Sequence, residues 1–429
     1  MRRLDSNKPD FAAAFGALVN ARRESDAGVS ADVAAILAQV KVEGDAALRD
    51  LTQKFDGFDL DREGWRIDPA ACQAAYDGLS GDLCDALLLA AARIRAYHAA
   101  QLPEDRDYTD EVGVRLGARW NAVEAAGIYV PGGRAAYPSS VLMNAIPAKA
   151  AGVARLVMVT PTPHGEINPA VLAAAHIAGV DEIWRIGGAQ AVAALAYGTD
   201  KIAAVDVITG PGNAWVAEAK RQLYGVVGID MVAGPSEIIV VADGANDPAW
   251  IAADLLSQAE HDPTSQSILF TDDADFADQV AAAVEAQLAE LATGAVAGAS
   301  WRDHGAIILT ESLEGAMPLV NRLAGEHLEL AVDACRAETL FALVRHAGSV
   351  FLGQYTPEAI GDYVAGPNHV LPTGRRARFA SGLSVLDFMK RTSFIGLDQA
   401  GLRAIGPAAA TLADAEGLPA HATSIRKRL

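Results

Sequence analysis

The sequence predicts an α/β fold with two parallel-sheet domains, and three observations support this prediction. Short apolar runs alternate with alanine-rich helical patterns from about residue 123, and strands that alternate with helices form parallel sheets with helices on both faces. A second series of the same kind begins after Pro235, which indicates two related halves. With 429 residues the chain is also too long for one ordinary core, so two or more domains are expected.

The region before these series is expected to be mainly helical. Apolar residues recur there at helical spacing in segments 33–40 and 87–94. Residues 383–429 form a separate tail, in which 383–388 is apolar and 411–416 is expected to be helical. So short a tail cannot bury a core of its own, and we expect it to pack on the body of the chain or on another subunit.

Eight short apolar runs are the strand candidates, four in each series. They lie at 126–130, 156–160, 183–186, 205–209, 238–241, 267–271, 306–309 and 328–332. Helical patterns lie between them, one covering 214–224 and another beginning near Pro248. Glycine-rich turns join several strands to the helices that follow, and nucleotide sites form at such turns in α/β sheets.

Composition and charge exclude several classes of function. A net charge of −19 opposes binding to nucleic acid, because a polyanion requires clustered lysine and arginine. The N-terminus has no apolar segment typical of a signal peptide, and charged residues and prolines interrupt the apolar stretches that could cross a bilayer. The three cysteines, Cys72, Cys84 and Cys335, lack metal-site spacing and indicate a reducing compartment. We therefore expect a cytoplasmic protein.

Three glycine turns are candidate cofactor sites, at 129–133, 187–190 and 210–213. The third comes nearest to the G-x-G-x-x-G fingerprint of dinucleotide-binding folds, but Trp215 occupies the position of its last glycine. That glycine permits close packing of helix and strand over the pyrophosphate, so this is not a standard fingerprint. The alternative, favoured by the pattern alone, is that the glycines only form short βα connections.

Four residues in the second half of the chain are candidate metal ligands. Gln258 and His261 lie three apart on the helical pattern after Pro248, so one face of a helix presents both. An amide oxygen and an imidazole suit zinc, and Asp362 and His421 could complete a four-ligand site. The alternative, again favoured by the pattern alone, is that Gln258 and His261 are polar residues at the end of a helix.

Glu326 and His327 are the candidate acid–base pair. They precede a strand, where adjacent side chains point to opposite faces, so both reach one site only if the backbone is irregular there. A carboxylate and an imidazole in one site suit proton transfer from water and from a hydroxyl group. The alternative is a solvated charge at the end of a strand. His369 is expected to order its loop rather than to take part in chemistry.

Long segments of the chain resemble the histidinol dehydrogenase family, in the order in which that family has them. From about residue 125 onward they are GIYVPGGRAAYPSSVLMNAIPAKAAGV, RIGGAQAVAALAYGT, ITGPGNAWVAEAKR, GIDMVAGPSEIIVVAD, LLSQAEHDP, GEHLEL, GDYVAGPNHVLPTG and SGLSVLDFMKR. The helical start with KFDGFDL also fits, so the resemblance covers nearly the whole chain. Blocks of this length in a fixed order are far more specific than any short motif.

This resemblance implies a role for each candidate residue. The implied ligands of one zinc ion per subunit are Gln258, His261, Asp362 and His421. The implied acid–base pair is Glu326 and His327, and the implied NAD contacts are Tyr129, Gln190 and Asn213. The residues implied to bind the substrate are Ser236, Gln258, His261, His327, Asp362, Glu416 and His421.

The resemblance also implies an architecture of two Rossmann-like domains, a helical N-terminal arm and a small C-terminal tail domain. The arm would be residues 1–22. The first domain, 23–125 with 236–382, would hold zinc and the acid–base pair, and the second, 126–235, would contact NAD. The tail, 383–429, would be exchanged across a homodimer with shared active sites. The implied reaction is a zinc-dependent, four-electron oxidation of L-histidinol through L-histidinal to L-histidine with two NAD, the final steps of histidine biosynthesis.

Two other functions are the alternatives. A paralogous zinc and NAD dehydrogenase of another small polar alcohol, such as a sulfonated diol, would keep the metal ligands and the acid–base pair but would lack the carboxylate that binds the imidazole. Glu416, five residues before His421, argues against it. The intact pair of Glu326 and His327 argues against a catalytically inactive metal- or nucleotide-binding protein.

Overall fold

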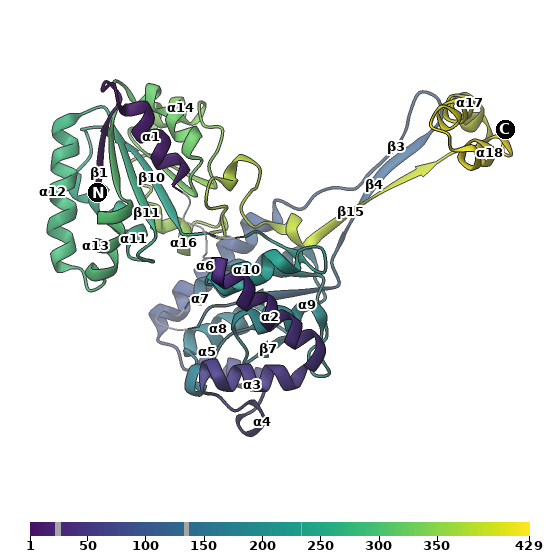
Figure 1. Cartoon of the computed structure of the whole chain (residues 1–429), viewed down its shortest axis with the longest axis horizontal. Helices are drawn as coiled ribbons and strands as arrows, with labels where there is room; N and C mark the ends of the chain where they lie inside the picture. The colour runs from purple at the N-terminus through teal and green to yellow at the C-terminus, as the bar shows by residue number, and fades with distance from the viewer. Residues whose placement is uncertain (22–26, 133–136, 233) are drawn as a thin grey trace.

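Figure 1 shows the computed structural model of the chain, in which residues 1–21, 27–132, 137–232 and 234–429 are described. Two six-stranded sheets form the cores of two domains, and a three-stranded antiparallel sheet projects away from them (Figure 1). The predicted α/β fold with two parallel-sheet domains is therefore confirmed. Among the described residues, no helix has the length and apolar character needed to cross a membrane.

Domain A comprises residues 1–21 and 237–363 and is built on a fully parallel sheet in the order β1-β12-β11-β10-β13-β14. Its strands are β1 (Arg2–Asp5), β10 (Glu237–Ala242), β11 (Gln266–Thr271), β12 (Ala306–Leu309), β13 (His327–Ala331) and β14 (Ser349–Leu352). One face is covered by α1 (Phe11–Asn20), α14 (Leu313–Leu323) and α15 (Ala334–Phe341). The other face is covered by α11 (Pro248–Ala259), α12 (Ala274–Glu290) and α13 (Gly294–His304).

Domain B comprises residues 27–104 and 123–232, and its strand order is β2-β7-β6-β5-β8-β9. The strands are β2 (Arg66–Ile67), β5 (Ala125–Tyr129), β6 (Arg155–Val159), β7 (Glu182–Trp184), β8 (Val207–Thr209) and β9 (Gly228–Ile229), of which only β2 pairs antiparallel to its neighbour. One face packs on α2 (Ala27–Glu43), α3 (Asp45–Asp56), α9 (Gly188–Tyr197) and α10 (Ala214–Leu223). The other face packs on α5 (Pro69–Asp77), α6 (Gly81–Ala99), α7 (Pro138–Ala151) and α8 (Pro169–Ala178).

The observed packing differs from the expected division of the chain. Residues 23–125 are expected to accompany 236–382, but the described helices and the β2 strand of that segment pack mainly in domain B. The reason is that the apolar faces of α2 and α3, including Val33 and Leu48, are buried against α9 and its sheet. The expected helical arm at 1–22 is likewise partly a strand, because β1 pairs with β12 at the edge of the domain A sheet.

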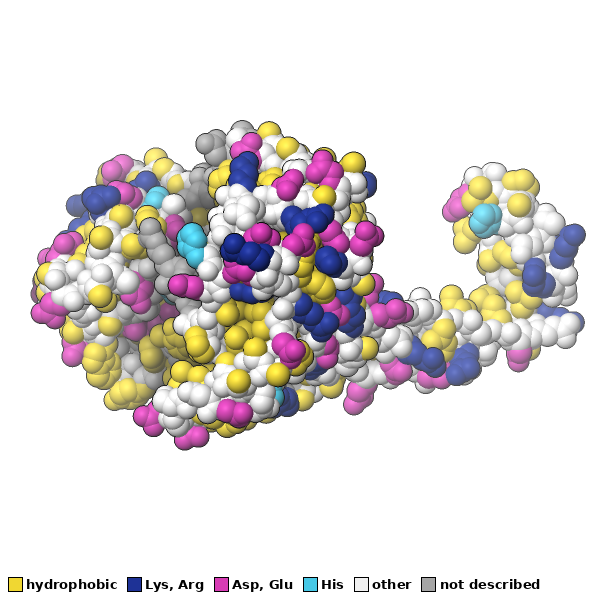
Figure 2. All heavy atoms as spheres, turned by 90° about the horizontal axis from the view of Figure 1, so that it is seen from below, with side chains coloured by type: hydrophobic (Ala, Val, Ile, Leu, Met, Phe, Trp, Pro, Cys, Tyr) yellow, Lys and Arg dark blue, Asp and Glu magenta, His cyan; other side chains and the backbone are white. Residues whose placement is uncertain are grey.

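A long arm carries the C-terminal tail away from both domains. The arm is formed by β3 (Arg106–Thr109), β4 (Arg115–Ala122) and β15 (Met389–Gly396), and α17 (Gln399–Ala415) and α18 (Pro419–Arg426) lie at its far end (Figure 1). These two helices pack on each other around Ala410, Ala413 and Ala422. In the space-filling view the tail stands clear of the rest of the chain (Figure 2).

Candidate active site

Glu326 and His327 meet at the backbone of one residue, Glu237. Ala324 adopts a left-handed conformation (φ 50°) at the end of α14, and Glu326 lies just before β13, so the alternation of side chains along the strand does not apply to it. The Glu237 N–H donates to Oε2 of Glu326 at 2.9 Å, and Nδ1 of His327 lies 3.1 Å from the Glu237 carbonyl oxygen. Because Oε2 of Glu326 and Nδ1 of His327 are 3.8 Å apart, the two side chains occupy one site.

The protonation of His327 follows from its partner. A carbonyl oxygen only accepts a hydrogen bond, so Nδ1 carries the proton and Nε2 is the basic nitrogen. Nε2 is buried and has no hydrogen-bond partner among the described residues. Burial lowers the pKa of His327, so its imidazole is neutral near neutral pH. Burial also raises the pKa of Glu326 well above its ordinary range, against the smaller opposing effect of the Glu237 N–H.

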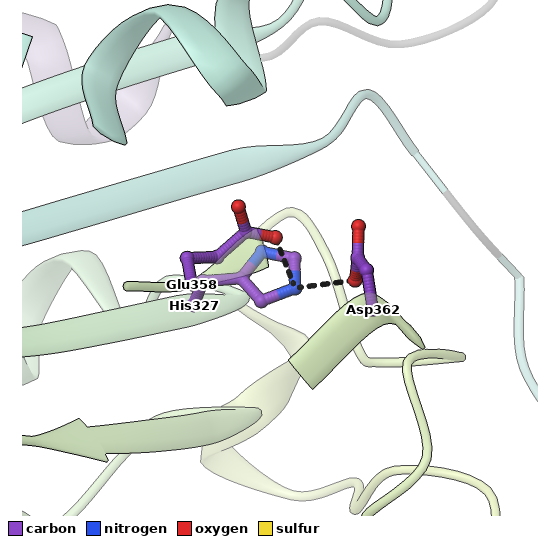
Figure 3. Close-up of side chains that lie close together, drawn as sticks. All are labelled: His327, Glu358 and Asp362. Carbon is purple, nitrogen blue, oxygen red and sulfur yellow. Dashed lines mark ion pairs between the residues drawn. The ribbon is translucent and has the colours of Figure 1, made fainter. Parts of the chain in front are cut away.

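Two carboxylates beside α16 (Ala359–Tyr363) point toward Nε2 of His327 (Figure 3). Oε1 of Glu358 lies 3.4 Å from this nitrogen, and Oδ1 of Asp362 lies 4.0 Å from it. Burial raises the pKa of each carboxyl group to about 7, and for Asp362 the nearby charge of Glu358 adds to the shift. The three side chains offer ligand atoms that lie within 4.8 Å of one another.

Gln258 and His261 lie next to each other at the end of α11. The helix ends at Ala259, so His261 follows its last turn instead of sharing a regular helical face with Gln258. Nε2 of Gln258 is nevertheless 3.2 Å from Nδ1 of His261. Burial lowers the pKa of His261, and the nearby His327 adds to this shift.

His369 lies against the same cluster and holds the α16 segment. Its Nδ1 donates to the Asp362 carbonyl oxygen at 3.1 Å and lies 3.8 Å from the Asp362 carboxylate. Burial lowers the pKa of His369 to about 4. This contact agrees with the expected role of His369 in ordering its loop.

The donor set fits a bound cation of the zinc class. Oε1 of Gln258 and Oε1 of Glu358 are both buried without a hydrogen-bond partner among the described residues, and buried polar atoms are normally satisfied. A cation would satisfy such oxygen atoms and keep Asp362 ionised despite its burial. Imidazole nitrogen together with amide and carboxylate oxygen is a donor set that zinc accepts.

One chain alone does not bring His421 and Glu416 to this cluster. Glu416 follows the end of α17, His421 lies in α18, and both side chains are exposed. Both helices lie at the far end of the arm, away from the elements that hold the rest of the candidate site (Figure 1). Ser236, by contrast, directly precedes β10 and is the neighbour of Glu237, whose backbone both members of the acid–base pair contact.

The three glycine turns line one cavity of domain B, of about 830 Å³. Tyr129, Gln190 and Asn213 all border it. The Tyr129 hydroxyl accepts a hydrogen bond from the Gly188 N–H at 3.0 Å, and the Asn213 side chain caps α10. Gly133, at the end of the first turn, lies outside the described residues.

The turn at Gly210 needs its glycine, although the fingerprint is incomplete. Gly210 has φ +111°, and a Cβ atom there would lie 2.2 Å from the Tyr129 carbonyl oxygen. Trp215, at the position of the missing third glycine, borders the same cavity and is 40% exposed. The indole therefore lies at the rim of the cavity, while the turn keeps a close approach to the end of β5 at Tyr129.

Sequence reasoning missed Glu358 as a member of the site. Glu358 and Asp362 are four residues apart and adjoin one helical turn, a spacing that places both on one face. That spacing was available in the sequence, but the segment around Pro357 shows no apolar periodicity that would have predicted a helix.

Comparisons with known proteins point to one family. A sequence model of the histidinol dehydrogenase family matches residues 19–429. Histidinol dehydrogenase of Zymomonas mobilis is 66% identical over 427 residues, which span 100% of this chain and 99% of that protein. Histidinol dehydrogenase of Ruegeria pomeroyi is 61% identical and matches over 99% of this chain and 98% of its own length.

A solved structure is similar over the same extent. The crystal structure of histidinol dehydrogenase from Elizabethkingia anophelis superposes with a TM-score of 0.94 at 36% sequence identity. The match covers 100% of this chain and 98% of that one, so the two domains, the arm and the tail all have counterparts there.

Proposed function

Because this chain belongs to the histidinol dehydrogenase family, we propose that it catalyses the zinc-dependent, four-electron oxidation of L-histidinol through L-histidinal to L-histidine with two NAD. One observation supports this proposal most directly. Glu326 and His327 bind the N–H and the carbonyl oxygen of the same buried residue, so a base and a carboxylate are held in one site, with the carboxylates of Glu358 and Asp362 beside the imidazole.

His327 acts in the first oxidation. Its Nδ1 is fixed as a donor to Glu237, so Nε2 takes the proton of the substrate hydroxyl as the carbinol carbon loses a hydride. The lowered pKa of His327 keeps Nε2 free of a proton at neutral pH. The product of this step is L-histidinal, which stays bound, and this retention protects the reactive aldehyde.

Glu326 acts in the second oxidation. Its carboxylate takes a proton from water, and the water oxygen adds to the aldehyde carbon. The aldehyde oxygen receives the proton that Nε2 of His327 took in the first oxidation, which gives the hydrate and leaves Nε2 free again. Burial raises the pKa of Glu326, which makes its ionised form a stronger base than an exposed glutamate. The hydrate then loses a second hydride from its carbon while Nε2 of His327 takes the proton of one of its hydroxyl groups, and L-histidine is released.

We assign the orientation of the substrate to the metal ligands and to residues of the partner subunit's C-terminal tail. Gln258, His261, Asp362 and His421 of the partner subunit would hold zinc, which supplies a Lewis-acidic anchor for the substrate. Glu416 of the partner subunit would accept a charge-assisted hydrogen bond from the substrate imidazole N–H. Ser236 and His327 would complete the substrate contacts. The exposed position of the tail supports its exchange in a homodimer (Figure 1).

The domain B cavity is assigned to the cofactor. Tyr129, Gln190 and Asn213, which border this cavity, would contact NAD, and the bound cofactor would supply the hydride acceptor for each oxidation. The cavity lies at the carboxyl ends of β5, β6 and β8, where open parallel sheets bind nucleotides.

The half-reactions test this division of roles. Glu326→Gln should slow oxidation of L-histidinal by about 100-fold or more and leave oxidation of L-histidinol much less affected, since only the second step needs water activation. NADH formation from each substrate under single-turnover conditions separates the two steps. Glu338→Gln, an exposed change on α15, is the matched control. Equal loss in both half-reactions would contradict the assignment of water activation to Glu326.

A further inference from the structure

A partly buried carboxylate, that of Asp56, borders the domain B cavity in a position that is unfavourable for a negative charge. Asp56 is the last residue of α3 and lines this cavity opposite the glycine turns of Tyr129 and Gln190. Its Oδ2 atom is buried and has no hydrogen-bond partner among the described residues. Burial, with a smaller contribution from the nearby Asp56 charge, raises the pKa of Tyr129 to about 12, so the carboxylate lies close to the phenol at the cavity wall.

Two effects disfavour the negative charge of Asp56 at this position. A negative charge at the C-terminal end of a helix meets the negative end of the helix dipole. Desolvation adds to that cost and raises the pKa of Asp56. The helix does not need Asp56 for its own termination either, because the left-handed Gly57 (φ 62°) forms the C-cap. An unpartnered carboxylate oxygen in such a place is best explained by a ligand that donates hydrogen bonds to it.

The chemistry of this wall suits a sugar more than a phosphate. A carboxylate accepts hydrogen bonds from hydroxyl groups, and dinucleotide-binding sites use an acidic residue to bind the ribose 2′-hydroxyl of NAD. A phosphate at the same place would bring a second negative charge next to a partly desolvated one, which is strongly unfavourable. Asp56 can therefore favour a free ribose diol and disfavour a 2′-phosphate.

The packing of the domains indicates which end of the cofactor lies here. Residues 364–388, which follow the catalytic α16, pack against α6 and α7 through Val370, Leu383 and Phe388. The opposite face of the domain B sheet carries α2, α3, α9 and α10. Of these, α10 and the start of α2 border domain A, whereas α3 lies on the side of domain B away from domain A (Figure 1). The reactive nicotinamide must reach the catalytic pair of domain A, so we assign the wall formed by α3 to the adenosine end.

We propose that Asp56 accepts a hydrogen bond from the 2′-hydroxyl of the adenosine ribose and thereby selects NAD over NADP. This inference rests on the proposed function, because it takes the domain B cavity as the NAD site. It adds a specificity-determining residue from the helical N-terminal segment to a cofactor site whose other contacts come from the glycine turns.

The test compares three cofactors in the holoenzyme with saturating L-histidinol: NAD, 2′-deoxy-NAD (lacking the adenosine 2′-hydroxyl) and NADP. In the wild-type protein, kcat/KM should fall by about 10-fold or more for 2′-deoxy-NAD, the size expected for a lost hydrogen bond to a charged group. In Asp56→Ala, NAD and 2′-deoxy-NAD should become nearly equivalent, and the preference for NAD over NADP should narrow by about 10-fold or more. The losses should be in KM for the cofactor, with KM for L-histidinol unchanged.

Asp32→Ala is the matched control, because Asp32 lines the same cavity from α2 but is exposed. The Asp32→Ala variant should keep the wild-type preference for NAD over both 2′-deoxy-NAD and NADP. Equal kcat/KM for NAD and 2′-deoxy-NAD in the wild-type protein would overturn the role of Asp56 without any variant. Absence of histidinol-dependent reduction of every cofactor would instead contradict the proposed function, so the two failures are distinguishable.

Discussion

Burial and the backbone of Glu237 together set the pKa values and the orientation of the two acid–base residues in this site. Glu237 binds Glu326 through its N–H and His327 through its carbonyl oxygen, which fixes a carboxylate and an imidazole tautomer at once. Burial then moves the two pKa values in opposite directions, up for Glu326 and down for His327. The imidazole is therefore ready to accept a proton at neutral pH, whereas Glu326 gains its basic form only as the pH rises.

The pH dependence of the second oxidation follows from this contrast. The rate of L-histidinal oxidation should increase with pH, because the protonated fraction of Glu326 falls only when the pH passes its raised pKa. The increase should be absent from Glu326→Gln, whose amide does not titrate in this range. Single-turnover rates across the pH range measure this directly. Two results would contradict a basic role for Glu326. One is a wild-type rate that does not change with pH, and the other is a variant whose rate increases with pH as steeply as that of the wild-type protein.

The metal ligands are a second prediction at this scale. His261→Asn and Asp362→Ala should weaken zinc binding by more than about 100-fold and abolish turnover, since even residues that only support metal ligands are worth about 10–100-fold in affinity. Zinc content after dialysis and activity upon zinc titration are the measurements. His176→Asn, an exposed histidine on α8, is the control. A metal-free variant with full activity would rule out the assigned ligands.

The residues of the candidate site could be predicted from the sequence only because they lie in long segments that resemble the histidinol dehydrogenase family. The individual patterns at Gln258, Glu326 and Tyr129 do not exclude structural roles, and it was the family resemblance that assigned them. The structure brings Glu326, His327 and Asp362 together and pairs Gln258 with His261. It adds Glu358, whose proximity to His327 depends on how α16 packs beside β13. No local pattern in the sequence encodes that contact.

At the scale of elements, buried strands were predictable and edge strands were not. All eight expected runs are strands, with bounds that shift by up to about two residues, because strands buried on both faces are continuous apolar segments. The strands β1, β2, β9 and β14 escaped prediction, since they lie at sheet edges or are only two residues long. The arm strands β3, β4 and β15 are largely exposed and carry mixed residues.

The Gly210 turn is held to α10 and β9 by a buried ion pair. Lys220 pairs with Asp230, both side chains are almost fully buried, and each also binds the Gly210 backbone. Removal of one partner leaves the other charge unpaired, so Lys220→Met should destabilise the fold by roughly 3–5 kcal/mol. It should also raise KM for NAD more than KM for L-histidinol. Urea unfolding and steady-state kinetics check both effects.

The matched control for this change is Lys201→Met, because Lys201 is exposed. The double variant Lys220→Met with Asp230→Asn should recover part of the lost stability, since it removes the unpaired charge. An additive loss in the double variant would show that the two residues are not coupled.

At the scale of the whole molecule, the helices of the C-terminal tail do not pack against either domain of their own chain. The arm holds α17 and α18 away from both domains, and the exposed side chains include Ile395 at 71% and Leu412 at 65% (Figure 1). The expectation that so short a tail packs on another surface points to a second subunit. A mixture of His421→Ala and Gln258→Ala proteins should therefore regain activity, because one site of each exchanged dimer is complete.

Each variant alone should be nearly inactive, and random exchange of subunits should restore roughly a quarter of wild-type activity. Recovery should follow the time course of subunit exchange, which native mass spectrometry can measure. Verified exchange without recovery would place His421 outside the partner's site and would contradict the shared active site.

The amount of NADH formed per L-histidinol consumed, measured with and without a chelator, is the decisive test of a zinc-dependent, four-electron oxidation. We expect two NADH per L-histidinol, loss of the reaction after chelation and its return upon addition of zinc. One NADH per L-histidinol with release of the aldehyde, or an undiminished rate in metal-free protein, would contradict it.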